Sequence, residues 1–156
     1  MKLSTREDVG APAGVVFDAV SNFDEFERMV AQKGANIVRL DGPSQKSAGM
    51  AWDLGFKFRG RDRKAKVSLA EFQPPKQLKL ISTVGGLDVE MLVLVTPLSP
   101  SRSRVQVVMD LKPQTLSARL LTQSMKLAKS RLNDKFKARI ADYAGTIERE
   151  YRADAA

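Results

Sequence analysis

The chain has 156 residues, of which 43% are hydrophobic and 28% are charged. This composition is enough for one compact domain with a hydrophobic core and is too apolar for a disordered chain. The sequence contains no cysteine and no histidine, which excludes disulfides, thiolate or imidazole metal sites, and catalytic triads built on histidine. We therefore expect no metal and no cofactor. The first residues lack the apolar stretch of a secretory signal, so we expect a cytoplasmic protein.

Basic residues outnumber acidic residues by 26 to 18, which gives a formal net charge of +8 at pH 7. The charge is unevenly distributed along the chain. Acidic residues dominate residues 1–27, whereas basic residues dominate residues 57–66 and 112–139. Such asymmetry indicates either an anionic partner or the solvated faces of a strand and a helix.

Residues 2–9 are expected to form an opening strand, and two short helices follow it. Pro12 suits the first turn of the first helix, because its missing N–H has no partner within a helix there. The second helix is expected to begin near Ser21 or Asn22, whose side chains can cap a helix N-terminus. The start of the chain is therefore a strand followed by a helical pair.

From about residue 35, strand-length runs alternate with turn signals, of which Gly42–Pro43 is the first. This pattern predicts a meander of antiparallel strands. The clearest strand begins at Met50, where large apolar residues alternate with polar or small ones, so that one face is apolar and the other faces water. Residues 87–95 are apolar on both faces, which indicates cover on both sides or an interface.

After Pro113, apolar residues recur at spacings of three to four from Leu116 to Tyr151, which predicts one long amphipathic helix. Gly145 is the expected point of a bend or an early stop, because glycine is a poor helix former. The sequence contains no repeat and no linker, so we expect a single domain over residues 1–152 and a disordered tail over residues 153–156.

The predicted C-terminal helix is strongly basic. On one continuous helix Arg119, Lys126 and Lys137 fall in a single row, which is the expected surface for an anionic partner, either RNA or a membrane surface. The alternative is that these side chains form a solvated face beside a buried apolar stripe.

Two segments carry a resemblance to a known family: APAGVVFDAVSNFDEF at residues 11–26, and the Lys112-Pro113 pair before the last helix. Together with the order of elements, they resemble the START-like superfamily, also called the SRPBCC or polyketide cyclase and lipid-transport superfamily. The resemblance implies an α+β helix-grip fold, in which a curved antiparallel sheet wraps around the long C-terminal helix. It also implies a cavity for an apolar ligand between the sheet and that helix.

The alternation of side chains gives a candidate lining for this cavity, since an apolar pocket is the default ligand site. The alternative is that the same side chains simply pack together as core. The strands contribute Trp52, Leu54, Phe56, Phe58, Val67, Leu80, Met91, Val107 and Met109. The helix contributes Leu120, Leu121, Ser124 and Met125.

The leading hypothesis is that the protein binds or carries a small to medium hydrophobic ligand, such as a lipid, an isoprenoid or an aromatic molecule. The alternatives are a module that binds RNA, ribosomes or an anionic membrane, and a polyketide cyclase-like enzyme. Catalysis has little support, because no catalytic motif can be transferred from the superfamily. Tyr143, Glu71 and Arg63 could reach an inner wall, but nothing in their spacing demands it. The expected partner is an apolar small molecule, and a second copy of the chain is a further candidate.

Overall fold

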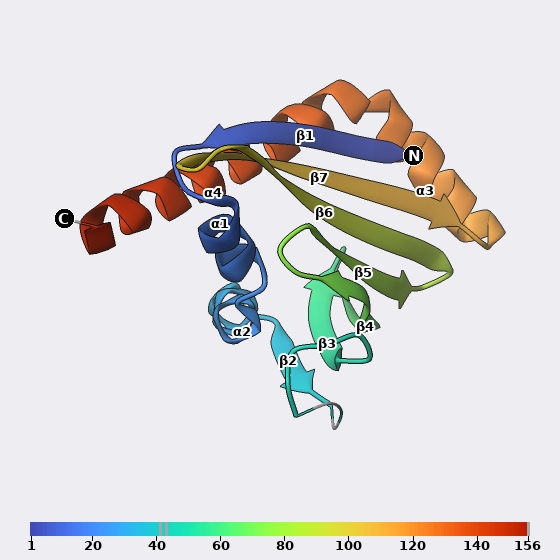
Figure 1. Cartoon of the computed structure of the whole chain (residues 1–156). Coiled ribbons are helices and arrows are strands. Elements are labelled where there is room, and N and C mark those ends of the chain that lie inside the picture. The colour runs from blue at the N-terminus through green and yellow to red at the C-terminus, as the bar shows by residue number, and fades with distance from the viewer. Residues whose placement is uncertain (41, 43, 156) are drawn as a thin grey trace.

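The computed structural model describes residues 1–40, 42 and 44–155. These residues form an antiparallel sheet in the strand order β1-β7-β6-β5-β4-β3-β2, together with four helices (Figure 1). The strands are β1 (Lys2–Val9), β2 (Asn36–Arg39), β3 (Ala51–Phe58), β4 (Arg61–Gln73), β5 (Gln77–Val84), β6 (Leu87–Ser99) and β7 (Arg102–Pro113). The helices are α1 (Ala13–Val20), α2 (Phe23–Gln32), α3 (Leu116–Leu127) and α4 (Lys129–Ala155). This is the α+β helix-grip architecture expected from the sequence.

The start of the chain has the predicted order of one strand and two short helices. Pro12 is the N-cap of α1, one position before the first helical turn. The side chain of Asn22 caps α2 by accepting the backbone N–H of Glu25 at 3.2 Å. The expected cap at Asn22 is therefore confirmed, whereas Pro43 of the predicted turn lies outside the described residues.

Two hairpins of the sheet are closed by turns of the same type. Arg59–Gly60 joins β3 to β4, Gly85–Gly86 joins β5 to β6, and all four residues have a φ between 52° and 79°. A positive φ at both central positions is typical of a type I′ turn, whose twist matches that of the flanking strands. These turns keep neighbouring strands in the antiparallel register that the meander predicts.

The C-terminal helix is broken, and the break does not fall at Gly145. The first helix ends at Leu127, Ala128 has non-helical dihedral angles (φ −106°, ψ 17°), and α4 begins at Lys129. Figure 1 shows that α3 and α4 meet at an angle. Gly145 is tolerated because the second half of α4 is held by packing, which outweighs helix propensity. Residues 153–155 of the expected tail continue α4, and Ala156 lies outside the described residues.

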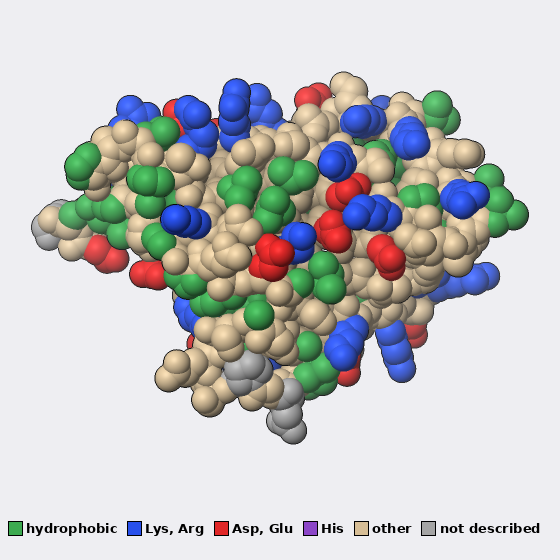
Figure 2. All heavy atoms as spheres, turned by 45° about the vertical axis from the view of Figure 1, so that its right-hand side comes forward, with side chains coloured by type: hydrophobic (Ala, Val, Ile, Leu, Met, Phe, Trp, Pro, Cys, Tyr) green, Lys and Arg blue, Asp and Glu red, His purple; other side chains and the backbone are tan. Residues whose placement is uncertain are grey.

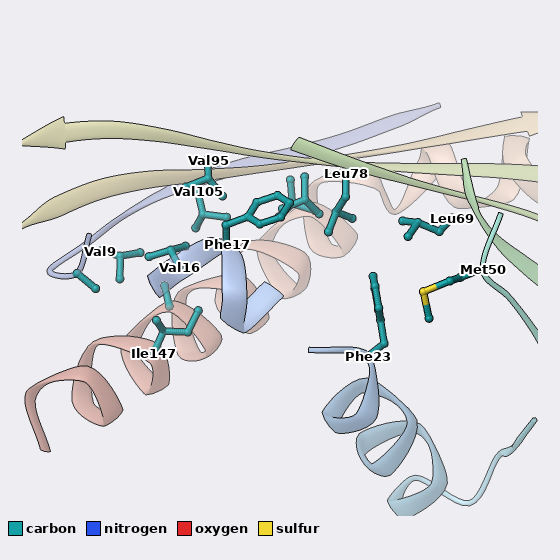
Figure 3. Packing of buried hydrophobic residues seen from close by; sticks show 14 of the residues in the cluster. Val9, Val16, Phe17, Phe23, Met50, Leu69, Leu78, Val95, Val105 and Ile147 are labelled. Atoms are coloured by element: carbon teal, nitrogen blue, oxygen red, sulfur yellow. The ribbon is translucent and has the colours of Figure 1, made fainter. Parts of the chain in front are cut away.

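The core lies on one face of the sheet, against α1, α2 and the second half of α4 (Figure 3). We call this face the inner face, and we call the end of the sheet that these helices cover the packed end. The buried side chains of the packed end include Val9, Val16, Phe17, Phe23, Leu69, Leu78, Val95, Val105 and Ile147. A hydrogen bond from the N–H of Gly10 to the carboxylate of Glu148 (2.7 Å) fixes α4 beside the end of β1.

The opposite end of the sheet, which we call the open end, is covered much less completely. It consists of the ends of β3 and β5, the starts of β4 and β6, and the beginning of α3. There Gln114 donates its backbone N–H to the carbonyl of Gly86 (2.7 Å), which connects the start of α3 to the β5–β6 turn. Inner-face side chains such as Leu54, Phe56 and Val84 are half-buried.

Candidate functional site

Half-buried apolar side chains follow the inner face of the sheet toward the open end. The register places Leu54 opposite Ala65 and Leu80 opposite Met91, so that inner-face residues of neighbouring strands are adjacent. We call this set the inner apolar surface. Its members are Leu54, Phe56, Val67, Leu80, Val84, Val89, Met91 and Met109. Because these side chains are neither fully covered nor fully solvated, they can contact a bound apolar molecule.

The guanidinium group of Arg63 lies beside this apolar surface. It lies opposite Phe56 in the register of β3 and β4, and it alternates with the same face as Ala65 and Val67. Among the described residues, its Nε is buried and has no hydrogen-bond partner. The ion pairs between described residues do not include Arg63 either. A guanidinium nitrogen of Arg63 lies 4.0 Å from the position that a Cβ on Gly85 would take, so the side chain reaches the β5–β6 turn.

The unpartnered Nε has a clear chemical consequence. A buried donor without an acceptor costs about 1–3 kcal/mol, so an acceptor supplied by a bound molecule would recover that free energy. The planar guanidinium donates in a fork that fits a carboxylate, phosphate or sulfonate. It stays protonated in proteins, so it can orient and stabilise an anionic group but cannot exchange a proton as a general acid or base.

The structure separates the predicted cavity residues into three groups. Trp52 and Val107 are buried in the core. Phe58, Leu120 and Ser124 are exposed. The half-buried residues are Leu54, Phe56, Val67, Leu80, Met91, Met109, Leu121 and Met125.

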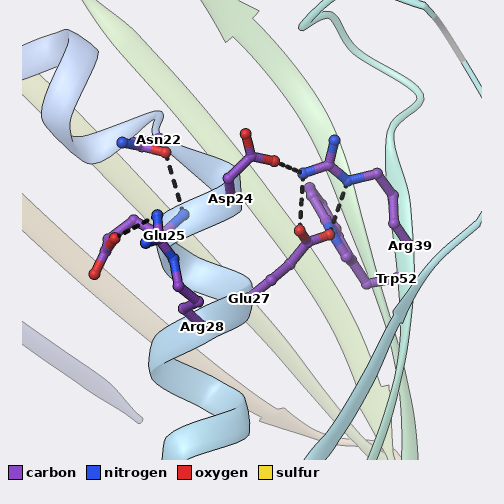
Figure 4. A network of polar contacts seen from close by, with 7 residues as sticks. All are labelled: Asn22, Asp24, Glu25, Glu27, Arg28, Arg39 and Trp52. Carbon is purple, nitrogen blue, oxygen red and sulfur yellow. Dashed lines mark hydrogen bonds and ion pairs between the residues drawn. The ribbon is translucent and has the colours of Figure 1, made fainter.

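Trp52 belongs to the packed end. Its exposed fraction is 0%, and its ring lies 5.2 Å from that of Phe23 and 6.0 Å from that of Phe26. Its indole N–H donates to the carboxylate of Glu27 at 3.0 Å (Figure 4). Because α2 covers the start of β3, Trp52 lies in the core and not among the half-buried residues of the inner apolar surface.

The four residues predicted to line the cavity from the helix lie on different sides of α3. Leu120 is 59% exposed and Ser124 is exposed, because α3 turns a different side toward the sheet. That side carries Ala118 and Thr122, both of which are buried. Phe58, at 46% exposure, lies at the tip of the β3–β4 hairpin, where the guanidinium of Arg59 stacks 5.4 Å from its ring centre.

The predicted row of Arg119, Lys126 and Lys137 does not exist as one row. It requires a continuous helix, and the break at Ala128 separates the first two residues on α3 from Lys137 on α4. All three side chains are exposed. A basic surface is therefore present on each helix, but the two surfaces have different directions.

Of the three polar residues that could reach an inner wall, Arg63 is the one that lies beside the inner apolar surface, opposite Phe56. Tyr143 instead donates its hydroxyl hydrogen to the carbonyl of Ala19 at 2.9 Å and joins α4 to α1. Burial, followed by the charges of Glu150 and Glu25, raises the pKa of Tyr143 to about 12. The tyrosine therefore stays neutral at physiological pH.

Glu71 lies on the opposite face of the sheet. A register shift between Leu69 and Glu71 places Glu71 opposite Lys79, whose ammonium group lies 3.9 Å from its carboxylate. Gln77 also donates a hydrogen bond to Glu71 at 3.1 Å. These contacts show that Glu71 pairs with neighbouring side chains on the outer face of the sheet and does not reach the inner apolar surface.

A second polar cluster joins α2 to β2 at the packed end (Figure 4). Arg39 donates to Asp24 at 2.7 Å and to both oxygens of Glu27 at 2.8 and 3.0 Å. The hydrogen bond with Glu27, followed by that with Asp24, raises the pKa of Arg39 against the opposing effect of burial. Since Glu27 also holds Trp52, the cluster has a structural role.

The described residues also form two surface hollows, of which the first shares Val89 with the inner apolar surface. One, of about 390 Å³, is on the outer face of β4, β5 and β6, and its lining includes Lys66, Ile81 and Glu90. The other, of about 340 Å³, lies between the α1–α2 junction and β2, and its lining includes Phe23 and Arg39. Over the part of the chain that the structure describes, no helix is long and apolar enough to cross a membrane.

The architecture and the position of the inner apolar surface define the START-like, or SRPBCC, fold class. A scan against models of protein families and a search of curated protein sequences each find no match. The fold class therefore rests on likeness to solved structures.

One such structure is the Zhui aromatase/cyclase from Streptomyces, with a TM-score of 0.69 and 12% identity over 99% of this chain and 97% of that chain. Norcoclaurine synthase from Thalictrum flavum, in complex with dopamine and hydroxybenzaldehyde, has a TM-score of 0.61 and 12% identity over 80% of this chain and 76% of that chain. A START superfamily protein from Mycobacterium smegmatis has a TM-score of 0.54 and 16% identity over 86% of this chain and 95% of that chain. The chain thus has the START-like fold.

Proposed function

We propose that the protein binds a small apolar molecule bearing an anionic group at the inner apolar surface. The observation that carries this proposal is the buried Nε of Arg63, which has no hydrogen-bond partner among the described residues. The apolar part of the ligand would contact side chains such as Phe56 and Met91, and its anionic group would accept hydrogen bonds from Arg63.

The class of ligand follows from the two kinds of contact that this surface offers, which are apolar contacts and hydrogen bonds from the guanidinium of Arg63. Apolar contacts contribute free energy in proportion to the area that leaves water, about 25 cal/mol per Å². The guanidinium adds orientation, because its donors have fixed directions. A flat aromatic or isoprenoid acid of small to medium size fits both requirements better than an uncharged hydrocarbon.

The solved structures support a small-molecule site without defining its ligand. Their names describe one protein as an aromatase/cyclase and another as a synthase in complex with two small aromatic molecules. Because one fold hosts several functions, these names support the class of ligand and not a reaction. Binding or carriage is the function we propose, since a permanently protonated guanidinium does not supply acid–base catalysis.

Two matched fluorescent probes test the proposal. Anilinonaphthalene sulfonate has an aromatic body and a sulfonate group, whereas N-phenylnaphthylamine has a similar body without the charge. We expect the sulfonate probe to bind to the native protein, and Arg63→Met to weaken it by roughly tenfold or more. The uncharged probe should change by less than about threefold, since its apolar contacts remain.

Lys64→Met is the matched control, because Lys64 is the next residue on β4 and is exposed on the outer face. It removes the same formal charge and should leave both probes unchanged. The proposal is wrong if neither probe binds to the folded native protein, or if Arg63→Met and Lys64→Met weaken the sulfonate probe equally.

A further inference from the structure

Three leucines on α3 are far more exposed to solvent than large apolar side chains usually are. The exposed fractions are 74% for Leu116, 59% for Leu120 and 93% for Leu127. At about 100° per residue these three positions fall within about 40° of one another, so they form one row along the helix. We call them the leucine row. Contiguous exposed apolar side chains with a polar rim mark interaction surfaces.

The leucine row is exposed because α3 packs on the protein through its other side. The buried residues Ala118 and Thr122 lie roughly on the opposite side of the helix from the leucine row. The half-buried Leu121 and Met125 lie on the same side as Ala118 and Thr122. The protein-facing side of α3 thus has its own apolar residues, and the leucine row is a separate apolar surface on the side that faces away. The break at Ala128 also separates α3 from the line of α4, so the row is not continued along the second helix.

Positive charge accompanies the row. Arg119 and Lys126 lie on one flank of the leucine row, about 60–80° from Leu116 around the helix, and both are exposed. The sequence has no acidic residue between Asp110 and Asp134. Figure 2, which brings this side of the molecule forward, shows apolar side chains at the surface between Lys and Arg side chains.

We propose that α3 docks the protein on an anionic lipid surface. The leucine row would enter the boundary between headgroups and acyl chains, while Arg119 and Lys126 would meet acidic headgroups. An apolar face beside a basic flank is the pattern of helices that lie in the membrane interface. Each basic residue near such a surface adds an attraction that salt screens. This inference goes beyond the proposed function and does not depend on ligand binding at Arg63.

A second copy of this chain fits the leucine row less well than a lipid surface does. In a twofold symmetric contact each patch meets itself. The basic flank of one α3 would then face a helix that has no acidic side chain to pair with it, and like charges placed close together oppose association. An anionic lipid surface instead matches both the apolar row and its charge.

RNA is also a poorer fit. The phosphate backbone would use Arg119 and Lys126 but would leave three exposed leucines without a contact. Single-stranded RNA is held largely by stacking on aromatic side chains, and α3 contains none. The leucine row therefore favours the membrane surface.

Sedimentation with lipid vesicles tests the proposal on the full chain. We expect the protein to bind vesicles of phosphatidylcholine and phosphatidylserine in a 7:3 ratio at physiological salt, and to bind pure phosphatidylcholine at least about tenfold more weakly. The triple change Leu116→Ser, Leu120→Ser and Leu127→Ser should lower the binding to anionic vesicles by about tenfold or more. The double change Arg119→Glu and Lys126→Glu should have an effect of similar size.

Matched controls use exposed residues away from α3. Val38→Ser with Leu98→Ser removes exposed apolar side chains elsewhere on the surface, and Lys33→Glu with Lys76→Glu gives the same change in net charge. Both control variants should bind like the native protein. A Leu120→Trp variant should show fluorescence quenching by lipids with brominated acyl chains, while Trp52, which is fully buried, should not respond.

The proposal is overturned if the native protein does not bind anionic vesicles, or if the leucine variant binds them as well as the native protein. It is also overturned if the leucine changes instead dissociate a dimer detected by sedimentation equilibrium. Binding of RNA at physiological salt that depends on Arg119 and Lys126 but not on the leucine row would assign the surface to RNA.

Discussion

The packed end and the open end are built from the same sheet but meet different helices. At the packed end, Phe17 of α1 and Trp52 of β3 are almost completely buried between the helices and the inner face of the sheet. At the open end, Phe56 is half-buried, and the Nε of Arg63 has no hydrogen-bond partner within the part of the chain that the structure describes. The residues that form the core and the residues to which we assign ligand binding are thus separated along the length of the strands. The packed end holds the fold together, and the open end leaves apolar side chains half-buried around the guanidinium of Arg63.

The separation has a simple physical origin. A helix with its side chains is about 10–12 Å wide, so one helix cannot cover a sheet of this width along its whole length. The cover from α1, α2 and the second half of α4 is concentrated at one end. On the side of α3 toward the sheet, Ala118 is buried but Leu121 and Met125 are only half-buried, so α3 covers the other end incompletely.

The largest expected effect comes from the same substitution made at each end. Phe17→Ala removes a side chain that is 2% exposed and packs 5.6 Å from the ring of Phe72. We expect it to lower the free energy of unfolding by about 3–5 kcal/mol. Phe56→Ala should cost about 1–2 kcal/mol, because the half-buried side chain already contacts water in the folded state. Urea denaturation followed by circular dichroism measures both values, and equal losses would contradict the distinction between the two ends.

Glu27→Ala tests the polar cluster that supports the packed end. The change removes the acceptor of the indole N–H of Trp52 and two hydrogen bonds from Arg39. We expect a loss of about 1–3 kcal/mol in unfolding free energy. Asp24→Ala removes the other carboxylate that Arg39 contacts, but Asp24 is 78% exposed, so its loss should be below about 1 kcal/mol. A comparable loss for the two variants in urea denaturation would remove the special role of Glu27.

Two glycines test how α3 is attached to the open end. Gly60 and Gly86 are both second residues of type I′ turns, with φ of 74° and 79°. An added Cβ would meet nothing within 4 Å at Gly60, but at Gly86 it would collide with the side chain of Thr115, the N-cap of α3. We expect Gly60→Ala to cost about 1 kcal/mol from the backbone conformation alone. Gly86→Ala should cost about 2 kcal/mol and should also increase amide hydrogen exchange in α3. Equal exchange in α3 for the two variants would show that Thr115 moves aside without disturbing the helix.

Replacing Tyr143 is expected to change the free energy of unfolding only slightly at neutral pH, but to change how that free energy depends on pH above about 10. Tyr143→Phe removes the hydrogen bond to the Ala19 carbonyl, which should cost about 1 kcal/mol at pH 7. Burial raises the pKa of Tyr143 from its ordinary value of 10.0 to about 12 in the folded state. The folded protein therefore holds a proton that the unfolded chain has released, and the free energy of unfolding decreases as pH rises from about 10 toward 12.

The phenylalanine variant provides the control for this pH dependence. It lacks the ionisable hydroxyl, so its unfolding free energy should fall less steeply than that of the native protein between pH 10 and pH 12. Urea denaturation at pH 8, 10 and 11 separates this contribution from the deprotonation of lysines, which both proteins share. Parallel curves for the two proteins would show that the Tyr143 environment is not desolvated.

The order and kind of the secondary-structure elements could be predicted from the sequence alone. Alternation from Met50 onward and the helical spacing beyond Leu116 are local periodicities, and they depend on which residues face a core rather than on where that core lies. The cap at Asn22 follows in the same way from a local hydrogen bond. The resemblance of residues 11–26 to the START-like superfamily agreed with this order and with the fold that the structure has.

Only the tertiary structure decided which inner-face residues are core and which remain accessible. Alternation gives Trp52 and Phe56 the same direction, but α2 covers the first and leaves the second half-buried. Leu120 lies on the side of α3 away from the sheet, and the break at Ala128 places Lys137 on a different helix from Arg119. The physical reason is that burial depends on contacts between segments far apart in the chain, such as α2 with the start of β3. Periodicity can assign a side chain to a face, but only the packing of a second element on that face decides whether water is excluded.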